Sequence, residues 1–110
     1  MMNWEILAQT MPKEINGVPI DAAIITSEEN CRYISGFHAS ARVVVVTREI
    51  AYLLTDFRYG EAARMQVKDC KVVVYQKLAK SIEEILRRHD IRGVLLEHEH
   101  LTLAQADIYE

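Results

Sequence analysis

Short apolar runs alternate along the chain with amphipathic segments. Residues 42–47 contain four consecutive valines, and such a run of β-branched side chains favours a strand over a helix. Further apolar runs predict strands at residues 22–25, 50–55, 72–75 and 93–96. The connection between 42–47 and 50–55 is too short for a parallel crossover, so we expect these two strands to form an antiparallel hairpin.

The amphipathic segments predict helices. Trp4, Leu7 and Met11 recur at helical spacing, which predicts a first helix over about residues 3–11. The apolar positions of residues 78–89 also fall on one helical face. N-cap signals mark the start of three more helices: Thr26 with Glu29, Asp56 before a segment that carries Tyr59, Ala62, Ala63 and Met65, and Thr102 with Gln105.

The order of these elements predicts an α/β domain. Gly17-Val18-Pro19 breaks the first helix, and Gly36 ends the second in the left-handed conformation that glycine adopts most easily. Strands alternate with helices after the hairpin, which implies parallel neighbours. We therefore expect one mixed sheet of about five strands, with one antiparallel hairpin and helices flanking it.

The end of the chain indicates that the domain is a cut fragment. The last predicted helix begins at Thr102 and stops only eight residues later at Glu110. An acidic residue there opposes the helix dipole, which favours a cation at the carboxyl end. We expect residues 1–110 to be a single domain that has been shortened at its C-terminus.

Composition narrows the class of protein. Half of the 110 residues are hydrophobic and 26% are charged, as in a globular domain. The net charge is −3 and the longest basic run is Arg87-Arg88, which argues against nucleic acid as a partner. The chain lacks a signal peptide and an apolar stretch of about 20 residues, and Cys31 and Cys70 share no metal-ligand spacing. These features indicate a cytoplasmic protein without a membrane partner and with reduced, unpaired thiols.

Three polar clusters are candidates for chemistry. Glu97-His98-Glu99-His100 could hold a metal, and a small metalloenzyme is one hypothesis, but a solvated loop before Thr102 is the preferred interpretation. His38 lies on a loop bounded by small residues, where it is either a ligand of an anion or substrate or an ordinary surface histidine. Arg58 opposes the dipole of its own helix, so it either binds a carboxylate elsewhere or pairs locally with Asp56 or Glu61.

The residues resemble a known family in several blocks that occur in family order. The blocks are Asn30-x-x-Tyr33-x-Ser35-Gly36-Phe37, Ser40-Ala41, the valine strand, Tyr52-Leu53-Leu54-Thr55-Asp56-x-Arg58-Tyr59, and Leu101-Thr102-Leu103 after Glu97. This pattern resembles the N-terminal domain of the creatinase and Xaa-Pro aminopeptidase family, and is most similar to bacterial Xaa-Pro dipeptidases (prolidases) and aminopeptidase P. The resemblance covers about residues 21–110.

The resemblance implies a ribonuclease-H-like mixed sheet and a parent enzyme that hydrolyses the bond before proline. In that family two divalent metals, often manganese or cobalt, are held by two Asp, one His and two Glu of a C-terminal pita-bread domain. None of those motifs lies in this sequence. We therefore expect no catalytic residue, metal ligand or cofactor in these residues, and we expect the metals to belong to the absent catalytic domain.

The resemblance also implies a role for His38 and Arg58. Both match positions that lie at the subunit interface of related enzymes and reach toward the neighbouring subunit's substrate site. Two departures leave open whether the parent is a prolidase or an aminopeptidase P: residues 37–42 lack the acidic residue and glycines of many relatives, and Phe57 replaces a common glycine.

Two functional hypotheses follow. The leading hypothesis is a non-catalytic N-terminal domain that helps a homodimer or higher homo-oligomer to assemble and to bind a proline-containing dipeptide or peptide. The alternative is a stand-alone module of the same fold that binds a peptide or protein, because a fold by itself does not define an activity.

Overall fold

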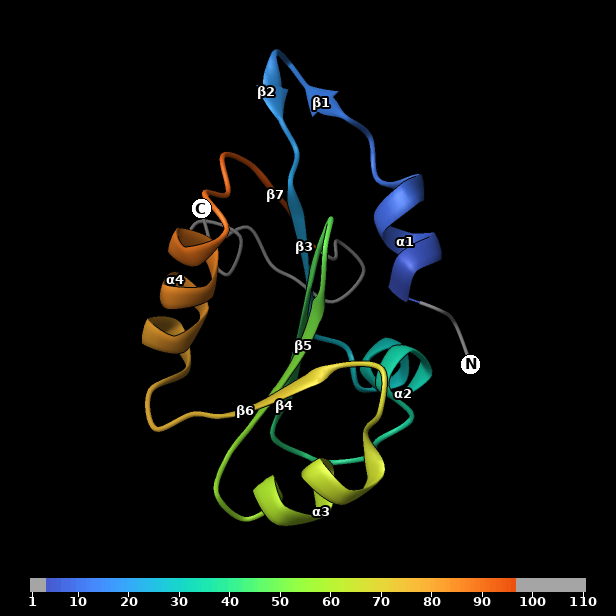
Figure 1. The fold of residues 1–110 in the computed structure, drawn as a ribbon, viewed down its shortest axis with the longest axis vertical. Helices are drawn as coiled ribbons and strands as arrows, with labels where there is room; N and C mark the ends of the chain where they lie inside the picture. The colour runs from blue at the N-terminus through green and yellow to red at the C-terminus, as the bar shows by residue number, and fades with distance from the viewer. Residues whose placement is uncertain (1–3, 97–110) are drawn as a thin grey trace.

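A five-stranded mixed sheet organises residues 4–96, the part of the chain that this computed structural model describes (Figure 1). The strands lie in the order β6-β5-β4-β3-β7. Their bounds are β3 Ala22–Ile25, β4 Arg42–Thr47, β5 Ala51–Thr55, β6 Lys71–Val74 and β7 Val94–Leu96. The helices within these residues are α1 Trp4–Thr10, α2 Glu28–Ser35, α3 Gly60–Gln66 and α4 Leu78–Arg88, and β1 Glu14–Ile15 and β2 Val18–Pro19 form a separate hairpin.

The pairing of the strands confirms the mixed sheet. β4 and β5 form the expected antiparallel hairpin, while β5–β6 and β3–β7 are parallel. β3 and β4 are also antiparallel, with Ile24 opposite Val45. The sequence did not predict this second antiparallel pair, because a helix such as α2 can join strands of either relative direction.

Both faces of the sheet are buried, which explains why the strands read as continuous apolar runs. Along β4, Val44 and Val46 belong to one core cluster, whereas Val43 and Val45 belong to the other. The first cluster is covered by α1, α2 and α3 and the second by α4, as Figure 1 shows on the two sides of the sheet. Strands with alternating polar positions would leave one face exposed to water.

Helix α2 begins one residue later than the sequence predicted. Ser27, rather than Thr26, is the N-cap, and its hydroxyl oxygen accepts a hydrogen bond from the Asn30 amide at 3.2 Å. The Thr26–Glu29 capping box is therefore wrong, because adjacent hydroxyl residues compete for the same role and the backbone selects one. The expected end at Gly36 is confirmed: its φ is 76° and its amide donates to the Arg32 carbonyl at 2.7 Å.

Helix α3 also differs at its start. It begins at Gly60, and its N-cap Tyr59 makes no side-chain capping bond, so the prediction that Asp56 caps this helix is wrong. Asp56 instead accepts from the Arg58 amide at 3.0 Å, which closes a tight turn directly after β5. Of the apolar residues that the sequence analysis named in this segment, Ala63 is buried whereas Met65 is 73% exposed.

The N-terminal hairpin β1–β2 was missed. Asn16 and Gly17 both have positive φ, 52° and 81°, as a two-residue hairpin turn requires. The Asn-Gly pair was the available signal, but Gly17-Val18-Pro19 was interpreted only as a helix breaker. The Thr102 cap and the cluster at residues 97–100 lie outside the described residues. None of the helices within residues 4–96 has the length and apolar character needed to cross a membrane.

Cys31 and Cys70 are thiols and are not joined in a disulfide, as expected, and both are buried. Cys31 donates its thiol to the Ile25 carbonyl at 3.2 Å. Burial, with a smaller contribution from Asp69, raises the pKa of the Cys70 thiol from 9.0 to about 11. Because the thiolate is the reactive form, the reactivity of Cys70 is suppressed at neutral and mildly basic pH.

Alkylation of the native chain should therefore be slow. At pH 8 the raised pKa lowers the thiolate fraction of Cys70 by about 100-fold relative to an ordinary thiol, and burial restricts access further. Mass spectrometry after iodoacetamide treatment should show almost no adduct on the folded chain and two adducts after unfolding in urea. Rapid labelling of Cys70 in the native chain, or a mass two protons lower without reductant, would contradict this prediction.

Candidate functional site

The two predicted site residues lie at one edge of the sheet, where β5 ends and β4 begins. Arg42, the first residue of β4, is paired with Thr55, the last residue of β5. His38 is in the loop that leads into Arg42, and Arg58 is in the turn that follows Thr55. The sheet register therefore brings together two segments that are about 20 residues apart in the sequence.

Hydrogen bonds join this loop and turn. The Thr55 hydroxyl donates to the Ala41 carbonyl at 2.5 Å, and Arg42 Nη1 donates to the Ser40 carbonyl at 2.8 Å. The Ser40 and Tyr59 hydroxyl oxygens are 2.8 Å apart and share a hydrogen bond. The loop of residues 37–41 is thus attached to β5 and to the turn before α3, so the edge has a defined shape.

Arg58 forms a side-on ion pair with Asp56. Its Nε and Nη2 lie 3.0 Å and 2.6 Å from Asp56 Oδ2. The hydrogen bonds from Arg58 lower the pKa of Asp56 below its ordinary value, and the carboxylate raises the pKa of Arg58. The guanidinium also lies over the Tyr59 ring, 5.2 Å from its centroid. The local pair with Asp56, one of the two interpretations of Arg58, is therefore present.

This pair leaves Arg58 able to bind a second carboxylate. A guanidinium has five N–H donors in a planar fork, and Asp56 occupies only the edge formed by Nε and Nη2. The end formed by Nη1 and Nη2 matches the spacing of another carboxylate. The Arg58 side chain is 57% exposed, so it can meet a ligand from solvent. Asp56 then orients the guanidinium without competing for its binding end.

His38 has a separate local partner. Its Nδ1 is 3.2 Å from Glu28 Oε1, in the first turn of α2, and the two side chains are 61% and 56% exposed. The contact orients the imidazole, and most of the His38 side chain stays exposed. The structure therefore places His38 and Arg58 at the same edge, with different neighbours.

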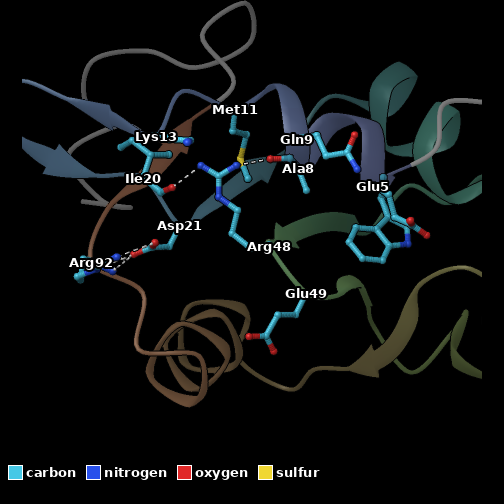
Figure 2. Close-up of a pocket in the computed structure, with 11 residues that line it drawn as sticks. Glu5, Ala8, Gln9, Met11, Lys13, Ile20, Asp21, Arg48, Glu49 and Arg92 are labelled. Atoms are coloured by element: carbon cyan, nitrogen blue, oxygen red, sulfur yellow. Dashed lines mark hydrogen bonds and ion pairs between the residues drawn. The ribbon is translucent and has the colours of Figure 1, made fainter.

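A pocket at the opposite edge was not predicted from the sequence. It has a volume of about 820 Å³ and lies between α1, the β1–β2 hairpin and the β4–β5 turn (Figure 2). Arg48 occupies its centre and donates to the carbonyls of Ala8, Pro12 (3.1 Å) and Ile20 (2.8 Å). The sequence shows Arg48 only as a cation in a short turn. Its role could not be predicted, because the carbonyls that accept its hydrogen bonds are 28 to 40 residues away.

The charged groups of this pocket hold the N-terminal segment on the domain. Asp21 accepts from Arg92 Nε at 3.0 Å, and this hydrogen bond lowers the pKa of Asp21. The Asp21 amide also donates to the Gly93 carbonyl at 3.0 Å. Because Arg48, Asp21 and Arg92 are all bound to groups of the same chain, we interpret the pocket as scaffold.

The donor side chains of the described residues do not gather into a metal centre. Across residues 4–96, no group of three or more His, Cys, Asp or Glu side chains is placed to hold a metal ion. The described residues therefore do not fit the two-metal centre that the resemblance implies for the parent enzyme. The Glu-His-Glu-His cluster at residues 97–100 lies outside them.

The mixed sheet, its antiparallel hairpin and the flanking helices place the chain among the α/β domains. Comparison with known proteins identifies the family of α/β domains to which it belongs. The sequence profile of the Creatinase/Prolidase N-terminal domain matches residues 9–110. The chain therefore belongs to the creatinase/prolidase N-terminal domain family, and its fold is the one found in solved members.

Three similar proteins illustrate this relationship. An uncharacterized peptidase of Bacillus subtilis, YqhT, is 44% identical over 54 residues, which cover 49% of this chain and 15% of the peptidase. The structure of an Xaa-Pro dipeptidase from Bacillus anthracis matches with a TM-score of 0.76 and 26% identity, over 84% of this chain and 26% of that one. The N-terminal domain of the cytoplasmic peptidase PepQ from Mycobacterium tuberculosis matches with a TM-score of 0.75 and 23% identity, over 96% and 78%.

The match to each of the two Bacillus peptidases spans about a quarter or less of the peptidase's own length. The likeness to PepQ, at 23% identity, concerns the fold alone.

Proposed function

We propose that this chain is the non-catalytic N-terminal domain of a cytoplasmic metallopeptidase that resembles Xaa-Pro dipeptidase and aminopeptidase P. In this proposal the domain supports homo-oligomer assembly and completes the substrate site of the neighbouring subunit. The observation that carries it is the exposed Arg58 side chain, whose guanidinium Asp56 holds side-on through Nε and Nη2. The similarity to the Xaa-Pro dipeptidase of Bacillus anthracis supports the substrate class.

The recognised group in this proposal is the carboxylate at the end of a proline-containing dipeptide or peptide. Arg58 would bind it through two parallel hydrogen bonds, a geometry that a lysine ammonium does not reproduce. His38 lies at the same edge and would contact the substrate or the partner chain through the side of its ring that faces away from Glu28. Both residues position the substrate; neither takes part in bond cleavage.

The reaction itself is assigned to a separate catalytic domain. That domain would hold two divalent metal ions, manganese or cobalt, which activate water for hydrolysis. In this proposal, this chain contributes binding and orientation. Reading the gene past Glu110 tests this assignment directly. Widely spaced Asp, Asp, His, Glu and Glu codons would support it, whereas a stop codon would favour the stand-alone binding module.

The purified 110-residue chain should not hydrolyse Xaa-Pro dipeptides, with or without added manganese. The physical reason is that a metal-activated water requires ligands that residues 4–96 do not bring together. Release of proline should be measured, with the full-length peptidase as the positive control. Turnover that scales with the amount of the short chain and stops with a chelator would overturn the assignment.

A further inference from the structure

We infer that Tyr59 is a positioning residue that links the His38 loop to the Arg58 guanidinium. This inference rests on the function proposed above, because it concerns how that substrate-binding edge is held in shape. Tyr59 contacts both segments: its hydroxyl shares a 2.8 Å hydrogen bond with Ser40, and its ring lies beneath Arg58 at 5.2 Å. Tyr59 thus joins the two segments that carry the predicted site residues.

The position of Tyr59 is set by its backbone. Its amide donates to the Asp56 carbonyl at 3.2 Å, and its carbonyl accepts from the Ala63 amide at 2.8 Å. The ring packs against the core cluster beneath α2 and α3. Tyr59 is therefore fixed by the turn, by the first turn of α3 and by the core. A side chain fixed in this way can restrain its less constrained neighbours, which are the His38 loop and the Arg58 guanidinium.

The Ser40–Tyr59 bond supplements two other anchors of this loop, because Ala39 is buried in the first core cluster and the Ala41 carbonyl accepts from Thr55. At one end Phe37 is buried and its amide donates to the Ser35 hydroxyl, and at the other end Arg42 enters β4. Between them, His38 and its partner Glu28 are both exposed, so their contact alone is weak. The bond from Ser40 to Tyr59 restrains the loop two residues from His38.

The two contacts of Tyr59 use different atoms and can be separated. Tyr59→Phe removes the hydroxyl but keeps the ring beneath Arg58, and Ser40→Ala removes the same hydrogen bond from the other side. Because the Ser40–Tyr59 bond is at the surface, its loss should affect the local order of the loop more than global stability.

Backbone ¹⁵N relaxation of the 110-residue chain tests the link without reference to any activity. In Tyr59→Phe and in Ser40→Ala, the order parameters of the His38 and Ser40 amides should fall measurably below the rigid-backbone value of about 0.85. The double variant should change no further, since both substitutions remove one bond. Tyr33→Phe, which makes the same chemical change on an exposed tyrosine of α2, is the matched control. An unchanged loop in Tyr59→Phe would overturn the inference.

Kinetics of the full-length peptidase distinguish this inference from the proposed function. Tyr59→Phe should raise KM about fivefold with little change in kcat, which corresponds to one lost hydrogen bond. If Arg58→Ala is impaired but Tyr59→Phe is not, Tyr59 is not a positioning residue and the inference fails. If neither variant is impaired although the loop loosens in the chain, the link stands as structure and the proposed substrate-binding role fails.

Discussion

Replacing Arg58 with alanine should lower the kcat/KM of the full-length peptidase for Xaa-Pro dipeptides at least about tenfold. The lost interaction is a charged, two-point contact with the substrate carboxylate, the kind of hydrogen bond that contributes most to recognition. Arg58→Lys should recover little of it, because an ammonium presents one point of contact. Thermal stability should change little, since the Arg58–Asp56 pair is at the surface.

The control for this experiment is Arg64→Ala, which removes an exposed cation from the last turn of α3. It should leave kcat/KM near the wild-type value, which would separate the effect of Arg58 from a general loss of positive charge. Wild-type kinetics in Arg58→Ala would leave Arg58 as part of the scaffold and would remove the main support for the proposed function.

Mixed oligomers decide whether Arg58 acts across the interface. Arg58→Ala subunits are combined with subunits inactivated in the catalytic domain, so that each parent oligomer has low or no activity. If Arg58 serves the neighbouring subunit, the hybrid should regain part of its activity wherever an intact Arg58 faces an intact catalytic centre. Activity that merely equals the average of the two parents would place Arg58 in its own subunit's site.

Gly93→Ala should destabilise the domain by about 3 kcal/mol, near the upper end of the cost of overpacking a tight contact. A Cβ at this position would lie 2.3 Å from the Pro19 carbonyl oxygen, and 3.0 Å and 3.1 Å from side-chain atoms of Val18 and Ile20. The nearest obstacle is backbone, which cannot rotate away as a flexible side chain would. Urea unfolding followed by circular dichroism measures the loss, and Tm should fall by roughly 12 °C.

Gly17→Ala is the matched control. It adds the same methyl group, but its expected cost comes from the backbone conformation and not from a steric clash. Gly17 has a φ of 81° and nothing within 4 Å of the added Cβ, so only the left-handed backbone is disfavoured. That cost is about 1 kcal/mol. If Gly93→Ala were no more destabilising than Gly17→Ala, the close approach of β2 to the start of β7 would not exist in solution.

The elements themselves could be predicted because their signals are local. The four valines of β4 and the short connection to β5 determine a strand and a hairpin over a dozen residues, and Gly36 ends α2 as expected. Two of the errors are also local, and they occur where two neighbouring structural roles compete. Thr26 and Ser27 are both able to cap α2, and Asp56 can cap a helix or close a turn. Local propensity does not distinguish between two such alternatives when both are favourable. The packing of the helix then determines which one forms.

The candidate site was predictable only in part. His38 and Arg58 were identified from loop chemistry and family resemblance, and the pairing of Arg58 with Asp56 was among the interpretations because the partners are two residues apart. The Ser40–Tyr59 bond was not predicted, since it joins positions 19 residues apart. Its existence depends on the register that places Arg42 opposite Thr55.

The sequence by itself determined a mixed α/β domain of the creatinase/prolidase type, because hydrophobic runs, turn residues and motif blocks act over short distances. The tertiary structure alone decided the antiparallel pairing of β3 with β4, the insertion of Arg48 among carbonyls up to 40 residues away, and the joining of the loop to the turn through Tyr59. Each of these contacts connects segments whose separation in space is set by the whole sheet, and no local pattern encodes that separation.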